Sequence, residues 1–343
     1  MRIRISLCLA VLLLTVPLLA AKRRSVTSPG GTGCGVPAVI DPRATAATWV
    51  AIDETDVYYF DDADRAVYRI SKNGGQRTEL AELEGFVVFD IALDENNVYV
   101  AAIPEEFDVT PLPGSIFAVP KSGGAYHTLV AGVIVPYQLA IDATHVYWLS
   151  FGTFAGEDPQ SDGKVERVRK DGTGRQTLAE GLSAPLALAV DDTNVFYSEL
   201  GVAIGNTSAG IRRVPKTGGT VVKVTDDFVA LGMTLTGTDI VYAGEARDGF
   251  SGGGILRLAK TGGTSQWLVH DDGLLGGPRL FEDQIYYVTT SDDETQDNLM
   301  RVPLAGGTPQ FLRVPEMVEY DFAIDTCGIY YGTYEGPLVR TPR

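Results

Sequence analysis

The chain has 343 residues, enough for one large all-β domain or two ordinary ones, and a formal net charge of −16 at pH 7. So acidic a chain should repel nucleic acid and anionic lipid, which leaves sugars, basic peptides and metal cations as partners. The simpler interpretation is that the charge keeps an exported protein soluble. Abundant Gly (39 residues) and many aromatic and β-branched residues favour short strands and tight turns over helices.

The N-terminal segment is typical of a targeting signal. Arg2 and Arg4 precede an apolar run from Ile5 to Ala21 that ends in small residues, the order found in secretory signal peptides. An uncleaved membrane anchor is the alternative, because a spanning helix needs roughly 17 residues or more. We therefore predict a signal peptide or anchor over residues 1–21, a linker over 22–34, and a secreted, periplasmic or cell-envelope location.

One unit recurs along the rest of the chain. Each copy begins with an apolar strand ending in an aspartate column, then an aromatic strand, a third strand and a Gly-Gly turn. The column positions are Asp53, Asp94, Asp142, Asp191, Thr236, Phe281 and Asp325. Their spacing runs from 41 residues (Asp53 to Asp94) to 49 (Asp142 to Asp191), the period of a four-stranded propeller blade. We predict an all-β, seven-bladed β-propeller with four antiparallel strands per blade over residues 35–343.

Three recurring residue types have structural explanations. The column aspartate can cap the turn after its strand through backbone N–H groups. Two places earlier stands a column of small residues, which suits strands that crowd near the axis. An arginine recurs in the third strand, at Arg69, Arg167, Arg213, Arg257, Arg301 and Arg340, and we interpret it as packing between blades.

The last unit is incomplete, because the sequence stops before a Gly-Gly turn. Residues 35–53 align without a gap to residues 307–325 through a Gly, a Pro and a closing Ala-Ile-Asp. We therefore expect residues 36–40 to pair beside residues 338–342, so that the N-terminal strand completes the last blade and removes the exposed sheet edges.

Two cysteines remain once residues 1–21 are removed. Cys34 lies at the start of the closing strand and Cys327 in the first turn of the same blade. In an oxidising compartment a Cys34–Cys327 disulfide is expected, and loop-closure models give it on the order of 3–5 kcal/mol. Two free thiols are the alternative.

The units VYW, RVPKTGG and LALAVD resemble bacterial exported propeller repeats of the TolB-like and YWTD-type families, over roughly residues 35–343. The resemblance implies the propeller fold. It implies no catalytic residues, because no catalytic motif of these families is matched, and their members include binding modules, scaffolds and some enzymes. They are usually described as six-bladed.

The loops between second and third strands vary most in length, and such loops on a rigid scaffold commonly carry function. They are rich in acids. We predict ligand-binding carboxylates at Asp61, Asp62, Glu105, Asp108, Glu157, Asp162, Asp292, Asp293 and Asp297. Clustered carboxylates would suit Ca²⁺, although residues 291–298 lack the spacing of an EF-hand. Solvated loop charge is the alternative, and no other cofactor is expected.

Arg279 breaks the column of small residues. A guanidinium near the axis could bind a carboxylate or phosphate of a ligand; the alternative is an ion pair with an acid of a neighbouring blade. No nucleophile-elbow sequence occurs, and the three histidines fall in different units, so no catalytic residue is assigned.

These patterns lead us to expect a monomeric binding or scaffold propeller that uses an acidic, loop-bearing face. Its partner would be a protein, a carbohydrate or another small molecule, with no nucleic acid and with membrane contact only through an uncleaved N-terminal segment. The alternative is a carbohydrate-active hydrolase or lyase with its site at the mouth of the central channel.

Overall fold

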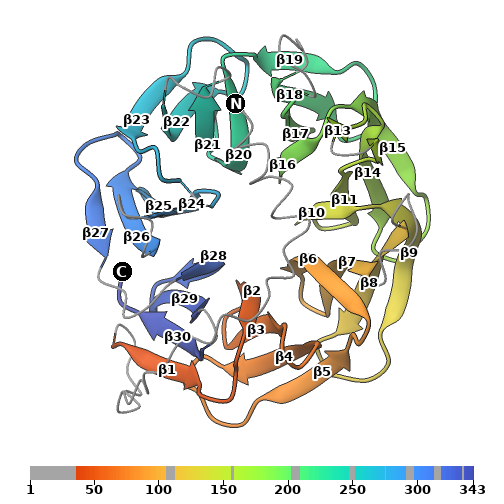
Figure 1. The fold of residues 1–343 in the computed structure, drawn as a ribbon, viewed down its shortest axis with the longest axis vertical. Helices are drawn as coiled ribbons and strands as arrows, with labels where there is room; N and C mark the ends of the chain where they lie inside the picture. Colours follow the sequence, from red (N-terminus) through yellow and green to blue (C-terminus); the bar gives the residue numbers. More distant parts are fainter. Residues whose placement is uncertain are drawn as a thin grey trace.

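The described strands form a ring of small sheets around one axis, as Figure 1 shows for the computed structural model. Seven sheets have four strands each, every strand pairing antiparallel with its neighbour, and the described residues include no helix. The prediction of an all-β, seven-bladed propeller is confirmed. The residues described are 36–105, 113–155, 158–201, 209–246, 252–274, 276–290, 297–312, 318–333 and 336–343.

The first six blades are each built from consecutive strands, from the innermost outward. Blade 1 contains β2 (Ala47–Ile52), β3 (Asp56–Asp61), β4 (Ala66–Ser71) and β5 (Thr78–Glu82). Blade 2 contains β6 (Phe86–Leu93), β7 (Asn97–Pro104), β8 (Pro113–Pro120) and β9 (His127–Ile134). Blade 3 contains β10 (Pro136–Ile141), β11 (His145–Ser150), β14 (Gly163–Arg169) and β15 (Gln176–Leu182), with a hairpin of β12 (Phe154–Ala155) and β13 (Asp158–Pro159).

The remaining blades follow the same plan until the ring closes. Blade 4 contains β16 (Pro185–Val190), β17 (Asn194–Glu199), β18 (Gly210–Pro215) and β19 (Val222–Thr225). Blade 5 contains β20 (Phe228–Leu235), β21 (Asp239–Ala246), β22 (Gly253–Ala259) and β23 (Gln266–His270). Blade 6 contains β24 (Arg279–Phe281), β25 (Gln284–Thr290), β26 (Asp297–Pro303) and β27 (Gln310–Leu312). Blade 7 contains β28 (Val318–Asp325), β29 (Gly328–Thr333), β30 (Leu338–Thr341) and β1 (Ala38–Asp41).

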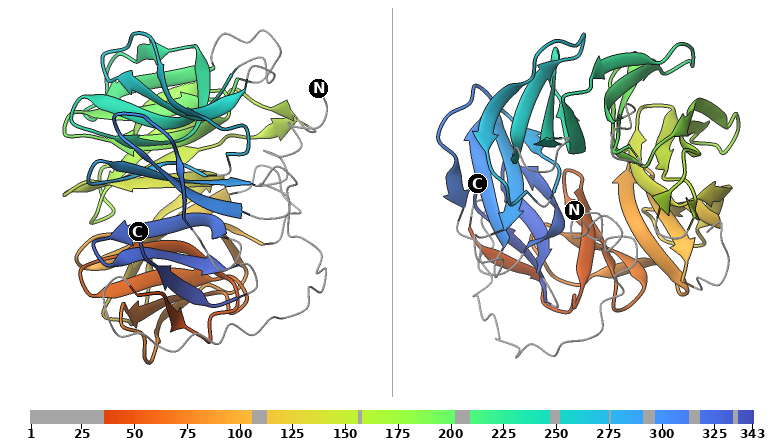
Figure 2. Two further views of the ribbon diagram at one scale, coloured as in Figure 1. Left: turned by 90° about the vertical axis from the view of Figure 1, so that its left-hand side faces the viewer. Right: turned by 45° about the horizontal axis from the view of Figure 1, so that its top comes forward.

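The strands run from one face of the ring to the other, as the side view in Figure 2 shows. We call the face with the first-to-second and third-to-fourth turns the latch face, and the opposite one the loop face. The apolar core lies between blades: Tyr58 of blade 1, for example, belongs to the same buried cluster as Phe117 of blade 2. Burial of these apolar side chains stabilises the packing between neighbouring blades.

The aspartate column caps turns on the latch face, as predicted. One carboxylate oxygen of Asp53 accepts hydrogen bonds from the backbone N–H groups of Thr55 (3.0 Å) and Asp56 (2.9 Å). The other accepts the hydroxyl proton of Tyr58 (2.9 Å). The same arrangement recurs at Asp94, Asp142 and Asp325.

Each column aspartate also binds a lysine of the following blade, and we call these ion pairs the latch pairs. The lysine comes from the Lys-X-Gly motif of the third-to-fourth turn. The pairs are Asp53–Lys121 (2.6 Å), Asp94–Lys170 (2.9 Å), Asp142–Lys216, Asp191–Lys260 (3.0 Å) and Asp325–Lys72 (2.5 Å). Burial opposes ionisation, but the lysine and backbone hydrogen bonds outweigh it and lower the pKa of the first four carboxylates.

The N-terminal strand closes the ring where it was expected to. β1 pairs antiparallel with β30, placing Ala38 opposite Arg340 and Val39 opposite Val339. The buried guanidinium of Arg340 donates to the carbonyl oxygens of Val36 (3.2 Å) and Lys72 (3.2 Å). One side chain therefore joins the N-terminal segment, blade 7 and blade 1. Residues 1–35 lie outside the described part, so the signal peptide and the linker stay predictions.

Candidate functional site

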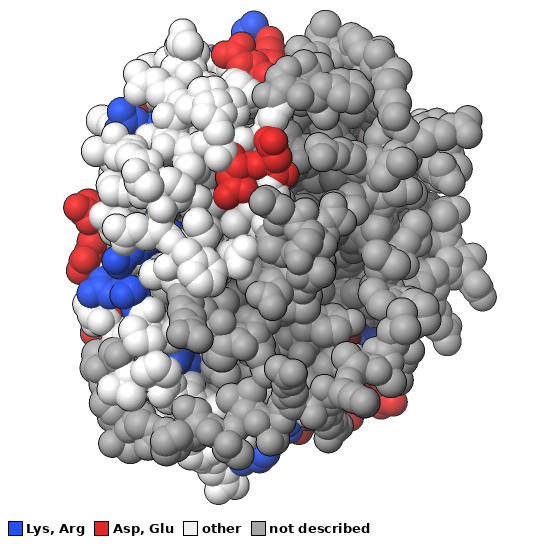
Figure 3. Space-filling view, turned by 60° about the vertical axis from the view of Figure 1, so that its left-hand side comes forward, with Lys and Arg blue, Asp and Glu red and all other residues white. Residues whose placement is uncertain are grey.

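Charged side chains of both signs are interspersed with uncharged ones over the described surface in Figure 3. Two of the acids predicted to bind a ligand already have a partner within the protein. Asp62 and Glu105 both bind the guanidinium of Arg65, at 2.8 and 2.6 Å, and so link blades 1 and 2. Asp162 accepts the backbone N–H and the hydroxyl of Thr153 (2.8 and 2.7 Å) and stabilises its own loop in blade 3. Asp62 and Glu105 thus meet at Arg65, whereas Asp162 is engaged within a different loop.

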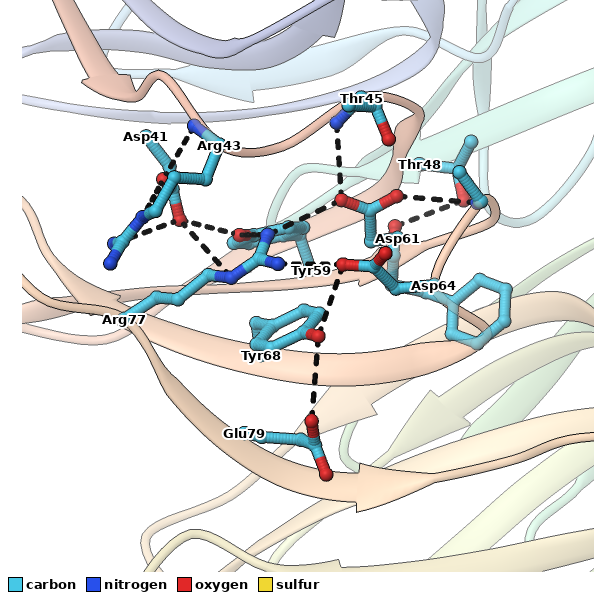
Figure 4. Close-up of polar contacts among 12 residues, drawn as sticks. Asp41, Arg43, Thr45, Thr48, Tyr59, Asp61, Asp64, Tyr68, Arg77 and Glu79 are labelled. Carbon is cyan, nitrogen blue, oxygen red and sulfur yellow. Dashed lines mark hydrogen bonds and ion pairs between the residues drawn. The ribbon is translucent and has the colours of Figure 1, made fainter.

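Asp61 is fully buried rather than exposed on the rim. Its carboxylate accepts backbone N–H groups of Thr45 and Ala63, both at 3.2 Å, and lies 3.4 Å from the guanidinium of Arg77. Figure 4 shows this network, which also includes the buried Asp41 of the closing strand. Burial raises the pKa of Asp61. The geometry is that of a carboxylate supporting the seam between blades 7 and 1.

Several predicted site residues lie outside the described residues or have side chains that are not described. They are Asp108, Glu157, Asp292, Asp293, Asp297 and Cys34. The backbone of Asp297 pairs with Thr290 at the start of β26. Cys327 donates its backbone N–H to Asp325 (2.7 Å), and its pairing with Cys34 stays a prediction.

Three charged residues on the innermost strands of different blades form a second candidate site near the ring axis, and we call Asp90, Arg279 and Asp321 the axial cluster. They come from the innermost strands of blades 2, 6 and 7. The guanidinium of Arg279 donates to the carboxylate of Asp321 across the junction of blades 6 and 7 at 2.6 Å. Arg279 therefore forms an ion pair with an acid of a neighbouring blade, which was the alternative to ligand binding in the sequence analysis.

Asp90 binds the next blade through its side chain. One carboxylate oxygen accepts the backbone N–H of Leu139 in β10 at 2.8 Å. Gln138 makes the same contact one blade on, its amide oxygen accepting the N–H of Leu188 at 2.6 Å. Both residues stand four places before their column aspartate, so the contact repeats with the blades.

Burial and neighbouring charges shift the pKa values of Asp90 and Arg279 in the axial cluster. Burial raises the pKa of Asp90 to about 7, and the Asp321 carboxylate adds to this, while the Leu139 N–H and the Arg279 guanidinium oppose it. The Asp321 carboxylate raises the pKa of Arg279 against the opposing effect of burial. All three residues are only partly buried, and 40% of the Arg279 side chain and 12% of the Asp321 side chain are exposed, so solvent reaches the cluster.

The sequence pointed to Arg279, but Asp90 and Asp321 were not among the predicted site residues. The signal lay in the column four places before the aspartates, which reads Trp49, Asp90, Gln138, Ala187, Gly232, Gly277 and Asp321. Two acids stand in a column whose other members carry no charge. In every blade except the sixth this place lies on the innermost strand, so a charge there lies near the centre of the ring.

No group of three or more His, Cys, Asp or Glu side chains is arranged to hold a metal ion among the described residues. Over the same residues, no helix has the length and apolar character needed to cross a bilayer.

Comparison with known proteins identifies the fold. No protein-family model matches the chain, and no curated protein resembles it in sequence. Among solved structures, an oligogalacturonate lyase from Vibrio parahaemolyticus superposes with a TM-score of 0.61 at 13% identity, over 89% of this chain and 91% of that one. A streptogramin B lyase gives 0.58 at 12% identity over 88% and 95%. A chain of the nidogen/laminin complex gives 0.52 at 16% identity over 80% and 93%. Similarity at these identities establishes a β-propeller whose structural neighbours include both enzymes and a binding protein.

Proposed function

We propose that this protein is an exported binding propeller and that the axial cluster is its ligand site. The proposal rests on the side chain of Asp90. Gln138 makes the contact to the next inner strand with a neutral amide, whereas Asp90 makes it with a carboxylate. The structural contact therefore needs no charge, and the ionisable group at position 90 calls for another explanation. Perturbed carboxyl groups of this kind are concentrated at functional sites.

The charges of the cluster favour a neutral or cationic ligand. Arg279 is paired with Asp321, so an ionised Asp90 would lack a cation of its own. An anionic ligand would meet two carboxylates in a chain of net charge −16. An ammonium group would supply the missing charge, and a hydroxyl group could donate to Asp90 while accepting from Arg279. Amino sugars offer both groups and neutral sugars offer the hydroxyl group, which fits the carbohydrate class expected from the sequence.

Approach to the axis from the loop face would favour the same ligands. Asp62 and Glu105 stand on that face with side chains 52% and 43% exposed, and they share a single arginine. The acidic loops would thus attract a cation toward the ring before it reaches the axis. Export, a monomeric state and the kinship with TolB-like and YWTD-type propellers are part of the same proposal.

A panel of three oligosaccharides that differ mainly in charge tests the ligand class. The probes are oligomers of glucosamine (cationic), N-acetylglucosamine (neutral) and galacturonate (anionic), titrated calorimetrically at pH 7.5. We expect the cationic or the neutral oligomer to bind and the anionic one not to. Binding of the galacturonate oligomer alone would overturn the charge argument, and binding of none would exclude these sugars as the ligand class.

A hydrolase or lyase is the second candidate, and the carboxyl group of Asp90 favours it. A pKa of about 7 would let this group hold and release a proton near neutral pH, as a general acid or base must. Asp321 would be the second carboxylate. The same oligomers, incubated with the protein, should then yield new reducing ends or an unsaturated product, and Asp90→Asn should abolish the reaction. No product from any oligomer would leave the binding proposal alone.

A further inference from the structure

The latch pairs do not continue around the whole ring. At the junction of blades 5 and 6 the two latch positions hold Thr236 and Leu304. Thr236 still caps its turn, since its hydroxyl accepts the N–H of Asp239 at 2.8 Å, but it carries no charge. Leu304 packs against an apolar cluster that includes Val241 of blade 5 and Val302 of blade 6. Both members of the ion pair have been replaced together.

At the junction of blades 6 and 7, a weaker cation–π contact stands in place of the latch pair. Its latch positions hold Phe281 and Arg343, whose guanidinium lies 4.7 Å from the centre of the phenyl ring. Arg343 also contacts Glu282 at 3.2 Å, but 60% of the glutamate side chain is exposed. Solvent-exposed ion pairs of this kind contribute little to stability. Among the blades as described, blade 6 is the only one with no Lys–Asp latch pair at either of its two junctions.

The innermost strand of blade 6 is also short. β24 has three residues, whereas the other innermost strands have six to eight. Just before it, Gly277 lies against Gly232 of blade 5, so closely that a Cβ atom on Gly232 would fall 2.4 Å from the Gly277 Cα. Two glycines in contact bury little side-chain surface. On the other side, the partly exposed Arg279–Asp321 pair is the polar tie to blade 7 near the axis.

We propose that blade 6 is the mobile blade of this ring and that the ring opens at the junction between blades 5 and 6. Each of the other junctions is held by an ion pair as well as by apolar packing. Between blades 5 and 6 the guanidinium of Arg257 reaches only a neutral acceptor, the Leu304 carbonyl oxygen, at 3.3 Å. Where the ion pair is missing, local opening has the smallest free-energy cost. Such an opening would admit a ligand to the axial cluster, if that cluster is the ligand site. The opening itself does not depend on a ligand.

Hydrogen–deuterium exchange on the full chain, without ligand, tests this directly. We expect peptides from residues 279–312 of blade 6 to exchange faster than the equivalent peptides from residues 185–225 of blade 4. The double variant Thr236→Asp/Leu304→Lys installs the missing latch and should slow exchange in blade 6 by about tenfold, the effect of one charge-assisted hydrogen bond. Each single variant adds one unpaired charge and should not slow it.

The reverse experiment covers the case in which the double variant fails to fold. Lys121→Met removes the latch between blades 1 and 2 and should bring exchange in these blades close to that of blade 6. Equal exchange of blades 4 and 6 in the unaltered protein would overturn the proposal. So would a double variant that slows exchange no more than its single variants. Because no ligand is present, failure of the proposed sugar site would leave these results unchanged.

Discussion

The ammonium group of Lys72 lies 2.5 Å from a carboxylate oxygen of Asp325, although 253 positions separate the two residues. The same ion pair joins consecutive blades elsewhere in the ring. Blade 1 is therefore attached to blade 7 by the contact that attaches blade 2 to blade 1, and chain connectivity is not needed for it. Together with the pairing of β1 and β30, this contact makes the seam resemble every other latched junction.

Loss of the closing latch should destabilise the protein measurably. Lys72→Met leaves the Asp325 carboxylate without its cation in a place where only 21% of that side chain is exposed. We expect the free energy of unfolding in urea to fall by about 1–3 kcal/mol. The control is Lys223→Met, because Lys223 is 65% exposed and pairs with Asp226 at 2.9 Å; its effect should stay within about 0.5 kcal/mol. Equal losses in the two variants would contradict the special role of the latch.

The latch aspartates predict destabilisation by acid. Their folded-state pKa values lie below the value of about 3.9 for an unfolded aspartate. The unfolded chain therefore binds more protons, and the stabilisation is complete above about pH 4 and lost as the pH falls below it. The melting temperature should drop steeply between about pH 4 and pH 2. A melting temperature that holds or rises over that range would be inconsistent with the charged latches.

The raised pKa of Asp90 predicts that, at higher pH, stability falls as the pH rises. Its folded-state pKa, raised to about 7, means that the folded protein holds a proton which the unfolded chain has released. Stability should therefore decline between about pH 4 and pH 7, by at most about 1.4 kcal/mol per pH unit, and level off above that. Asp90→Asn should remove this part of the slope. Parallel stability profiles for the variant and the unaltered protein would show that Asp90 titrates normally.

The predicted disulfide can be tested by counting thiols. In the mature protein, Cys34 and Cys327 should resist alkylation under native and denaturing conditions and react fully after reduction. Peptide mapping should recover the two cysteines in one crosslinked fragment. Alkylation of either cysteine before reduction would establish free thiols.

The architecture could be predicted because its determinants are local and repeated. The aspartate column, the aromatic strand and the Gly-Gly turn recur in sequence, and the alignment of residues 35–53 with 307–325 gives the register of the closing strand. The latch lysines were visible too, in the Lys-X-Gly turns. The partners of these lysines could not be predicted from the sequence, because an ion pair such as Lys121–Asp53 depends on which turns of adjacent blades face each other.

The candidate site was harder to predict because it arises only when the ring closes. Asp90 belongs to blade 2, while Arg279 and Asp321, 42 positions apart, belong to blades 6 and 7. No local pattern connects the three. Asp61 was misleading for a related reason: it ends a strand beside an acidic loop, yet the backbone at Thr45 folds over it and buries its carboxylate.

The most direct test of the proposed site compares the affinity of the best-bound oligosaccharide for three proteins by titration calorimetry. Asp90→Gln keeps a side chain able to make the contact that Gln138 makes but removes the carboxylate, and it should weaken binding by about tenfold or more. Asp171→Asn removes the charge of an exposed acid in the third-to-fourth turn of blade 3, on the latch face, and should bind like the unaltered protein. If Asp90→Gln binds as tightly as the unaltered protein, the axial cluster is not the ligand site.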